Sequence, residues 1–191
     1  MESPSISKYL VQDRMTKELD NDVLHRKGFN VNMRLFKEST GYRKIVLDII
    51  MYMEKISRKK FSDYPELKGI SGANIGIPLN IIGFRSSRDI SDGSFHIISE
   101  GEMYFMINPE IAQRWEDTKV IKSNCGSIRL PEKIDVKRTM QIEVKYCDIG
   151  GKSWKNVFHP PESFVIQHEV DHNLGVLVTD IEHKETKNVK G

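Results

Sequence analysis

The most regular hydrophobic pattern in the chain begins at Tyr42. Apolar residues recur there at helical spacing with charged residues between them, at Ile45, Val46, Ile49, Ile50, Met53 and Ile56. On a helix of 3.6 residues per turn these positions form one stripe. The pattern therefore predicts an amphipathic helix whose apolar face packs on a core.

A series of short β-favouring segments follows the glycine-rich stretch 68–78. The clearest is 140–146, where apolar and polar side chains alternate as in a strand with one buried and one solvated face. Asn108-Pro109 is expected to close an earlier strand, and 148–151 to form a turn. The predicted antiparallel strands are 79–84, 95–98, 103–107, 140–146 and 154–158.

The last well-marked element lies between Pro160 and Gly175. Proline is tolerated in a first helical turn, and glycine commonly follows a helix end. The mostly apolar sequence between them predicts a buried helix, and 176–178 is expected to form a short exit strand. The fold class is therefore α+β, with helices against antiparallel sheets.

Composition adds limits to this picture. The chain has 191 residues, 38% of them hydrophobic and 29% charged, which is usual for a soluble globular protein. We expect a single domain over 1–191, and the structure of the first forty residues stays open. Basic and acidic residues nearly balance at a formal net charge of +2, so no direct nucleic-acid partner is expected.

The chain also lacks the usual signals for secretion or membrane insertion. No apolar run approaches the roughly 18 residues of a membrane-spanning helix, and the polar start has no signal-peptide core. We therefore expect a cytoplasmic protein without a membrane partner. In that reducing compartment Cys125 and Cys147 are expected to be free thiols.

The predicted last helix carries an HExxH motif, His168-Glu169-Val170-Asp171-His172. Residues four apart lie on the same face of a helix, so both imidazoles can bind one metal ion. Glu169 is rotated by about 100° from His168 and can reach a water molecule as general base. Two ordinary surface histidines are disfavoured, because unpaired polar groups in an apolar helix are costly.

A catalytic metal usually has three protein ligands, so the third ligand decides the class of enzyme. Metzincin proteases need a histidine six residues beyond the second one, where this chain has Val178. A thermolysin-like site needs a glutamate on a further helix, for which the residues after Asp180 leave no room. The remaining candidate is Cys125, in the polar turn 123–127, although an ordinary buried cysteine is the alternative there. Cys147 is expected to be ordinary.

Three motifs in this order resemble those of the peptide deformylase family. They are a glycine-rich GLAAxQ-type loop, here ending at Asn74, an EGCLS motif, here 123–127, and a QHExDH motif, matched fully by Gln167–His172. The similarity covers 42–180, which we take as the catalytic core. It implies the deformylase fold, in which antiparallel β-sheets pack around a central HExxH-bearing helix.

The resemblance implies a metal-dependent amide hydrolase that removes the formyl group from N-formylmethionyl peptides. One divalent ion, Fe²⁺ with Zn²⁺ or Ni²⁺ as substitutes, would be held by Cys125, His168 and His172. N-formylated peptides would be the substrates, and nascent chains at the ribosome are candidate partners.

The same resemblance assigns the reacting groups. Glu169 would be the general base, while the backbone N–H of Gly126 and the amide of Asn74 would stabilise the oxyanion. Gln167 and an ion pair between Arg138 and Asp171 would support the site. The candidate substrate-binding residues are Gly69, Ile70, Gly72, Phe164 and Val165, the last two with ordinary core packing as the alternative.

The chain departs from the family pattern at two motifs. Asn74 stands where the family has glutamine, and only Cys125 and Ser127 survive of the second motif. Two other functions therefore stay open, namely hydrolysis of a different formamide or small amide, and a catalytically idle homologue that binds a ligand. The short sequence after Asp180 argues against ribosome docking through a long final helix.

Overall fold

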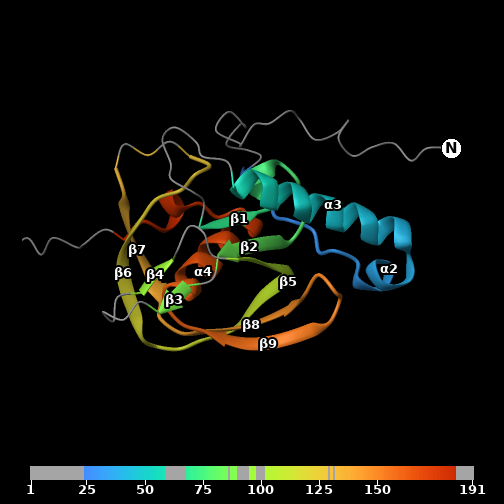
Figure 1. Ribbon diagram of the computed structural model, residues 1–191. Coiled ribbons are helices and arrows are strands. Elements are labelled where there is room, and N and C mark those ends of the chain that lie inside the picture. Colours follow the sequence, from blue (N-terminus) through green and yellow to red (C-terminus); the bar gives the residue numbers. More distant parts are fainter. Residues whose placement is uncertain are drawn as a thin grey trace, which may run out of the picture.

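The computed structural model describes residues 24–58, 68–85, 87–89, 95–97, 102–128, 130 and 132–183. Helices and strands are mixed along this part of the chain (Figure 1). In order they are α2 (Met33–Glu38), α3 (Thr40–Ser57), β1 (Gly69–Ser71), η3 (Ala73–Ile75), β2 (Ile81–Arg85), β3 (Ser87–Asp89), β4 (Phe95–Ile97), β5 (Met103–Arg114), β6 (Thr118–Ser123), β7 (Ile134–Thr139), β8 (Ile142–Cys147), β9 (Ser153–Phe158), α4 (Glu162–Asn173) and η4 (Val178–Ile181).

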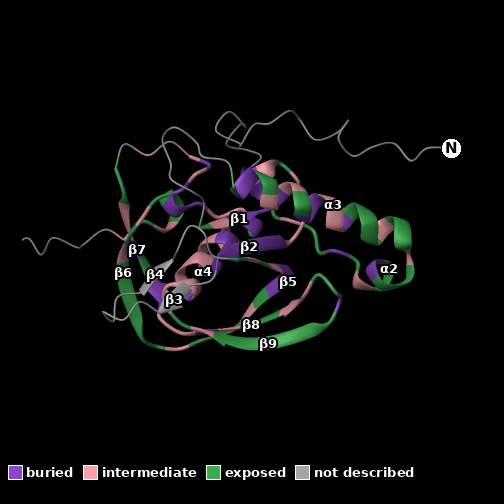
Figure 2. Ribbon diagram, in the orientation of Figure 1, coloured by how far each residue is buried: buried purple, intermediate pink, exposed green. Residues whose placement is uncertain are grey.

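A five-stranded antiparallel sheet is the frame of the fold. Its strand order is β1-β2-β5-β8-β9, and β3-β4 and β6-β7 form two further two-stranded sheets. Strand β2 is buried along its whole length, whereas β9 is almost entirely exposed (Figure 2). The large sheet is therefore covered at its β1–β2 side and open to solvent at its β9 side.

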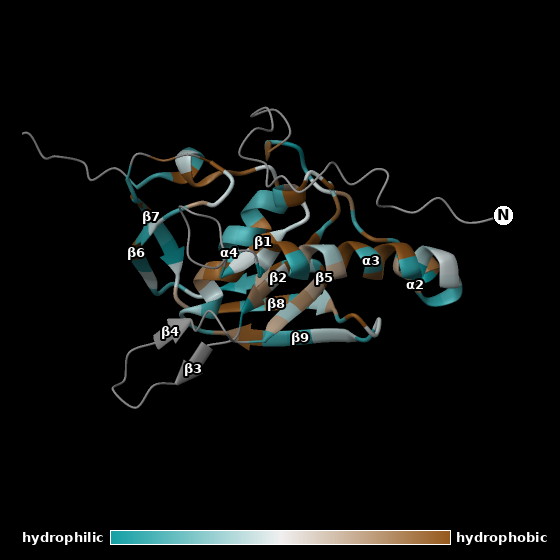
Figure 3. Cartoon of the chain, turned by 45° about the horizontal axis from the view of Figure 1, so that its top comes forward, coloured by the Kyte–Doolittle hydropathy of each residue, from teal (hydrophilic) through white to brown (hydrophobic). Residues whose placement is uncertain are grey.

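The two faces of the large sheet carry separate hydrophobic clusters. On one face, Val46, Ile50 and Met53 of α3 pack against Ile81 and other buried residues of the sheet. The mixed hydropathy of α3 along its length fits a helix with one buried face (Figure 3). On the other face, Ile166 and Val170 of α4 pack with sheet residues, including Ile82, Met106 and Val144. The sheet thus separates α3 from α4.

Helix α4 buries polar as well as apolar residues, because the large sheet and the β6-β7 hairpin both contact it (Figure 1). Gln167 shows how the buried polar groups are satisfied. Its Nε2 donates to the carbonyl oxygens of Thr139 and Ser163 at 2.8 and 2.9 Å, and its Oε1 accepts from the Thr139 N–H at 3.2 Å. The two bonds to Thr139 join the helix to β7.

Most of the predicted elements are present. The helix from Tyr42 is α3, the buried helix after Pro160 is α4, and the alternating strand is β8. The α+β architecture around the motif-bearing helix is confirmed. Residue 98 and the first 23 residues lie outside the described part, and the single domain over 1–191 stays a prediction.

Two predictions about secondary structure are wrong. Strand β5 does not close at Asn108-Pro109 but continues to Arg114, with a register shift between Ile107 and Glu110. Asn108 takes a φ of 54° there, and its side chain bonds both the N–H and the C=O of Val31. A bulge of this kind accommodates proline inside a strand.

The second wrong prediction concerns residues 176–178. The predicted exit strand 176–178 is absent, and the 3₁₀ helix η4 begins at Val178 instead. The side chain of Asp180 accepts from the Leu177 N–H at 2.7 Å and caps this short helix. No helix in the part of the chain that the structure describes is long and apolar enough to cross a membrane.

Gly175 offers a test of how the end of α4 is held. It has a φ of +75°, and an added Cβ would lie 2.3 Å from the carbonyl oxygen of His25. Gly175→Ala is expected to lower the free energy of unfolding by about 2 kcal/mol, because the left-handed backbone is strained with a side chain and the His25 segment must move. Urea denaturation would measure this loss.

Gly41 supplies the matched control. It lies in α3 with nothing within 4 Å of an added Cβ, so Gly41→Ala should leave stability unchanged or raise it by up to about 1 kcal/mol. Equal stabilities for the two variants would contradict the packing described at Gly175.

Candidate metal centre

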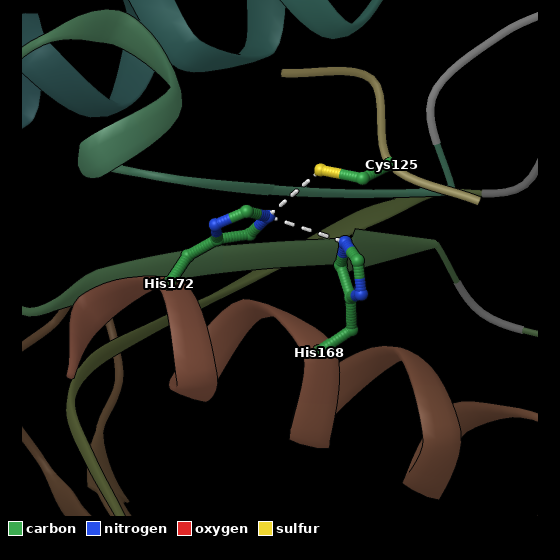
Figure 4. Close-up of side chains that lie close together, drawn as sticks. All are labelled: Cys125, His168 and His172. Carbon is green, nitrogen blue, oxygen red and sulfur yellow. Dashed lines mark hydrogen bonds between the residues drawn. The ribbon is translucent and has the colours of Figure 1, made fainter. Parts of the chain in front are cut away.

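Three ligand-type side chains converge at the centre of the fold (Figure 4). The Cys125 Sγ lies 3.3 Å from the His172 Nε2, which lies 3.2 Å from the His168 Nε2. All three donor atoms lie within 4.8 Å of one another. The structure therefore brings together the three residues that the sequence predicts as metal ligands.

Two different elements deliver these donors. His168 and His172 are one turn apart on α4, with ring centroids 4.7 Å apart and planes at 88°. Cys125 follows the end of β6 and is buried with Val136 and Val178. The β6-β7 hairpin and the segment after α4 thus hold the cysteine against the helix.

Two of the three donor separations come close to those expected around a bound transition-metal ion. Bonds of about 2.0–2.1 Å to nitrogen and about 2.3 Å to sulfur, in tetrahedral geometry, place ligand atoms about 3.3–3.6 Å apart. The observed separations of 3.2 and 3.3 Å lie close to this range. One thiolate with two imidazoles suits iron, zinc or nickel.

Burial controls the protonation of the donors. It lowers the pKa of His172 to about 4 and that of His168 well below its usual range, with Arg138 adding to the effect at both. Both imidazoles are therefore neutral at pH 7, the form that binds metal. Burial also raises the pKa of the Cys125 thiol to about 11, against the lowering effect of hydrogen bonds from Ser127. A bound cation would displace this thiol proton.

Glu169 lies beside the donors and is 4% exposed. Burial raises its pKa to about 8, against the lowering effect of the charge of Arg138. Its Oε2 has no hydrogen-bond partner among the described residues. A buried carboxylate with one unbonded oxygen next to a cation site is suited to accept a proton from water.

The glycine-rich loop makes room for this carboxylate. A Cβ on Gly69 would lie 2.5 Å from the Glu169 Oε1 and 2.7 Å from the Val165 Cγ1. Gly72 has a different role, because a Cβ there would meet the backbone oxygens of Leu79 and Ile77 at 2.5 and 2.6 Å. Close approach to Glu169 thus requires the first glycine, and loop closure the second.

The other predicted substrate-binding residues lie in or near the core. Ile70 is fully buried in the cluster that faces α3. Val165 is half-buried and packs against the cluster on the α4 face, and Phe164 is also half-buried on α4. Their contact with substrate stays a prediction.

Asn74 lies buried next to the cysteine turn. Its Nδ2 donates to the Ser127 Oγ at 2.6 Å, and its Oδ1 accepts from the N–H and the hydroxyl of Ser71. Gly126, between Cys125 and Ser127, is half-buried in the same turn. Sequence reasoning assigned no role to Ser71, because nothing along the chain indicates that its hydroxyl faces Asn74.

Charged side chains lie close to the candidate metal centre. Arg138 donates to Asp171, and both side chains are largely buried. Arg114, which sequence reasoning missed, donates to the Gln167 Oε1 at 2.8 Å. Its position at the end of the bulged strand β5 could not be read from the local sequence.

Comparison with known proteins identifies the family. The family model described as polypeptide deformylase matches residues 16–188. The chain belongs to this family. Members of the family are metal-dependent, which agrees with the cluster of Cys125, His168 and His172.

Curated relatives of this deformylase-family chain agree with the match. The peptide deformylase of Desulfotalea psychrophila is 30% identical over 145 residues, which are 72% of this chain and 79% of that protein. That of Rickettsia typhi is 39% identical over 77 residues, or 40% of this chain and 43% of that protein. That of Pseudothermotoga lettingae is 29% identical, over 59% and 57%. The chain thus spans about half the length of the last two relatives.

Solved structures show the same fold. The Met-Ala-Ser-bound peptide deformylase of Acinetobacter baumannii superposes with a TM-score of 0.71 at 21% identity, over 90% of this chain and 99% of that one. The Plasmodium falciparum peptide deformylase gives a TM-score of 0.66 at 19% identity, over 90% and 86%.

The two cysteines provide a test of the centre. Both are free thiols, but only Cys125 lies with the histidines. Cys125→Ser is expected to weaken metal binding by more than the roughly 10–100-fold that losing an outer partner of a ligand costs. Metal analysis and competition titration of anaerobically purified protein would measure this.

Cys147→Ser is the control, because Cys147 lies on β8 and contacts Ser153. It should keep one metal ion per chain with unchanged affinity. Wild-type affinity in Cys125→Ser, or metal loss in Cys147→Ser, would refute the assignment.

Proposed function

We propose that this protein removes the formyl group from N-formylmethionyl peptides, giving formate and a peptide with a free amine. The observation that carries the proposal is the convergence of one thiol and two imidazoles beside a buried carboxylate, in a chain of this family. This chain spans only about half the length of two of the curated relatives. The activity is therefore inferred from the site together with the family.

Cys125, His168 and His172 would hold one divalent ion, with ferrous iron as the native metal and zinc or nickel as substitutes. The donor chemistry and the distances support this assignment. When bound, the ion supplies a water molecule of lowered pKa and polarises the formyl oxygen. The three ligands leave a further coordination position for this chemistry.

Glu169 would move the proton. It takes a proton from the attacking water as the new C–O bond forms, and later gives that proton to the amine nitrogen as the formyl C–N bond breaks. Gly69 supports this role, since a side chain there would overlap Glu169. A nearby cation favours the ionised form of the carboxylate that the first step needs.

The negative charge on the formyl oxygen would be stabilised from the cysteine turn and the glycine-rich loop. The N–H of Gly126 and the amide of Asn74 are our candidates. Gly126 directly follows Cys125, and the Asn74 amide donates to Ser127, two residues after Cys125. Losing one such donor costs about 10²–10³ in rate in other enzymes. Asn74 and Gly126 would thus help to stabilise the transition state.

We also propose where the substrate lies and what supports the site. Gly69, Ile70 and Gly72 would line the peptide backbone, and Phe164 and Val165 would face the methionine side chain. The Arg138–Asp171 pair and Gln167 would keep α4 in place against β7.

The chemistry points to a setting for the reaction. N-formylmethionine begins newly made chains, so we place the activity in the cytoplasm, acting on nascent chains. The crystal structure of the Acinetobacter baumannii deformylase carries Met-Ala-Ser, and formyl-Met-Ala-Ser is therefore the test substrate.

Glu169→Gln should abolish most turnover of formyl-Met-Ala-Ser while metal content stays unchanged. The amide keeps the shape of the carboxylate but cannot take a proton, so kcat should fall about 10²–10⁴-fold. Formate release by the iron-loaded protein measures this.

Glu143→Gln is the matched control, because Glu143 pairs with Lys155 on the large sheet and does not contact the ligands. It should keep wild-type kcat. If the iron-loaded wild-type protein leaves formyl-Met-Ala-Ser intact at high enzyme concentration, the proposed substrate is wrong.

A further inference from the structure

Asn173 is a buried polar residue that directly follows the candidate ligand His172 on α4. Its Nδ2 donates to the Asn80 Oδ1 at 3.0 Å and to the Ile81 carbonyl oxygen at 3.3 Å. Because a backbone carbonyl can only accept, the amide nitrogen must be the atom that faces β2. Its Oδ1 has no hydrogen-bond partner among the described residues, so the side chain bonds the rest of the fold through its N–H groups alone.

The residues that accept these bonds close the loop 72–80, which carries Asn74. The Ile81 carbonyl oxygen that accepts from Asn173 also accepts from the Gly72 N–H at 3.0 Å. Helix α4 contacts β1, η3 and β2 around this point (Figure 1). The end of α4 and both ends of the loop therefore meet at one carbonyl oxygen.

Short links join this meeting point to the amide of Asn74. Ser71 directly precedes Gly72, and its N–H and hydroxyl donate to the Asn74 Oδ1 at 2.5 and 2.7 Å. The Asn74 Nδ2 donates to the Ser127 Oγ at 2.6 Å, in the turn that follows Cys125. Asparagine has a single methylene between its amide and its backbone, so the position of the amide follows the loop backbone closely.

The side of the loop that faces the end of α4 is not tightly packed. Ala73 and Gly76, on either side of Asn74, line a cavity of about 40 Å³ together with Gly28 and Asn173. Atoms beside a cavity have fewer packing contacts to fix them. The hydrogen bonds from Asn173 are therefore needed to set the position of the loop relative to the helix.

We propose that Asn173 is a positioning residue for the reaction, whose amide nitrogen fixes the loop 72–80 against α4 and so sets the distance between Asn74 and the metal centre. The inference rests on the proposed function and deepens it, because it names the residue that links the metal-binding helix to the oxyanion group. Asn173 itself does not touch the substrate.

Asn173→Ala is expected to lower kcat for formyl-Met-Ala-Ser about 10–100-fold, with KM unchanged. An oxyanion donor acts only in the transition state, so its displacement lowers kcat and kcat/KM equally. A misplacement of about 1 Å can cost about 10²-fold, and loss of the donor itself about 10²–10³-fold. Metal affinity should stay at the wild-type value, because all three candidate ligands remain. Formate release by the iron-loaded protein and competition titration measure the two quantities.

The double variant Asn74→Ala, Asn173→Ala distinguishes action through Asn74 from a general weakening of the fold. Once the Asn74 amide is gone, the position of the loop no longer affects the oxyanion, so kcat should equal that of Asn74→Ala alone. Asn80→Ala removes one of the two acceptors and should lower kcat by a smaller factor. It replaces Asn173→Ala in the comparison if that variant does not fold.

Ser163→Ala is the matched control, because Ser163 is also buried on α4 and donates to a carbonyl oxygen, that of Met140, at 2.8 Å. It should lower stability in urea denaturation and keep the wild-type kcat. Wild-type kcat in Asn173→Ala, an equal loss of kcat in Ser163→Ala, weaker metal binding, or additive effects in the double variant would overturn the inference. If one of these occurs while the wild-type protein releases formate, the proposed function stands. A wild-type protein that releases no formate would overturn both.

Discussion

The candidate metal centre depends on the close packing of three ligand-type side chains, Cys125, His168 and His172, against one another. Cys125 and His172 are 1% exposed, and their donor atoms lie 3.3 Å apart. Removing such groups from water is costly unless they are paired or bind a metal. The surrounding fold must therefore shield the three side chains from water and bring their donor atoms together. A cation is then a suitable partner for this cluster.

The layers around α4 meet this requirement from different directions. The large sheet covers one side of the helix, and the β6-β7 hairpin brings Cys125 to the two histidines. Gly69 lets β1 approach Glu169 closely enough that no side chain separates them. Buried Gln167 and the Arg138–Asp171 pair tie the helix to β7, so the candidate ligands and Glu169 belong to one packed unit.

Sequence reasoning succeeded where the determining interactions are local. The period of α3 and the alternation of β8 follow from single faces, and the two histidines are neighbours because they are four residues apart on a helix. Cys125 was a harder case. Its approach to the helix depends on the β6-β7 hairpin, whose largely exposed β6 has no clear alternation, and it was found only by excluding other third ligands and by resemblance to the family.

The features that could not be predicted arise from tertiary contacts. The bulge of β5 at Asn108 reflects bonds to Val31, which is distant along the chain. The links from Ser71 through Asn74 to Ser127 join two loops 53 residues apart. Sequence indicated that Asn74 is shorter than the expected glutamine, but the partners of its amide appear only in the folded chain.

X-ray absorption spectroscopy of the zinc-loaded protein tests the central claim most directly, because it counts the atoms bound to the metal. The account predicts one sulfur at about 2.3 Å and two imidazole nitrogens at about 2.0–2.1 Å, with a light atom completing the shell. A zinc shell without sulfur, or without the scattering of two imidazole rings, would contradict it.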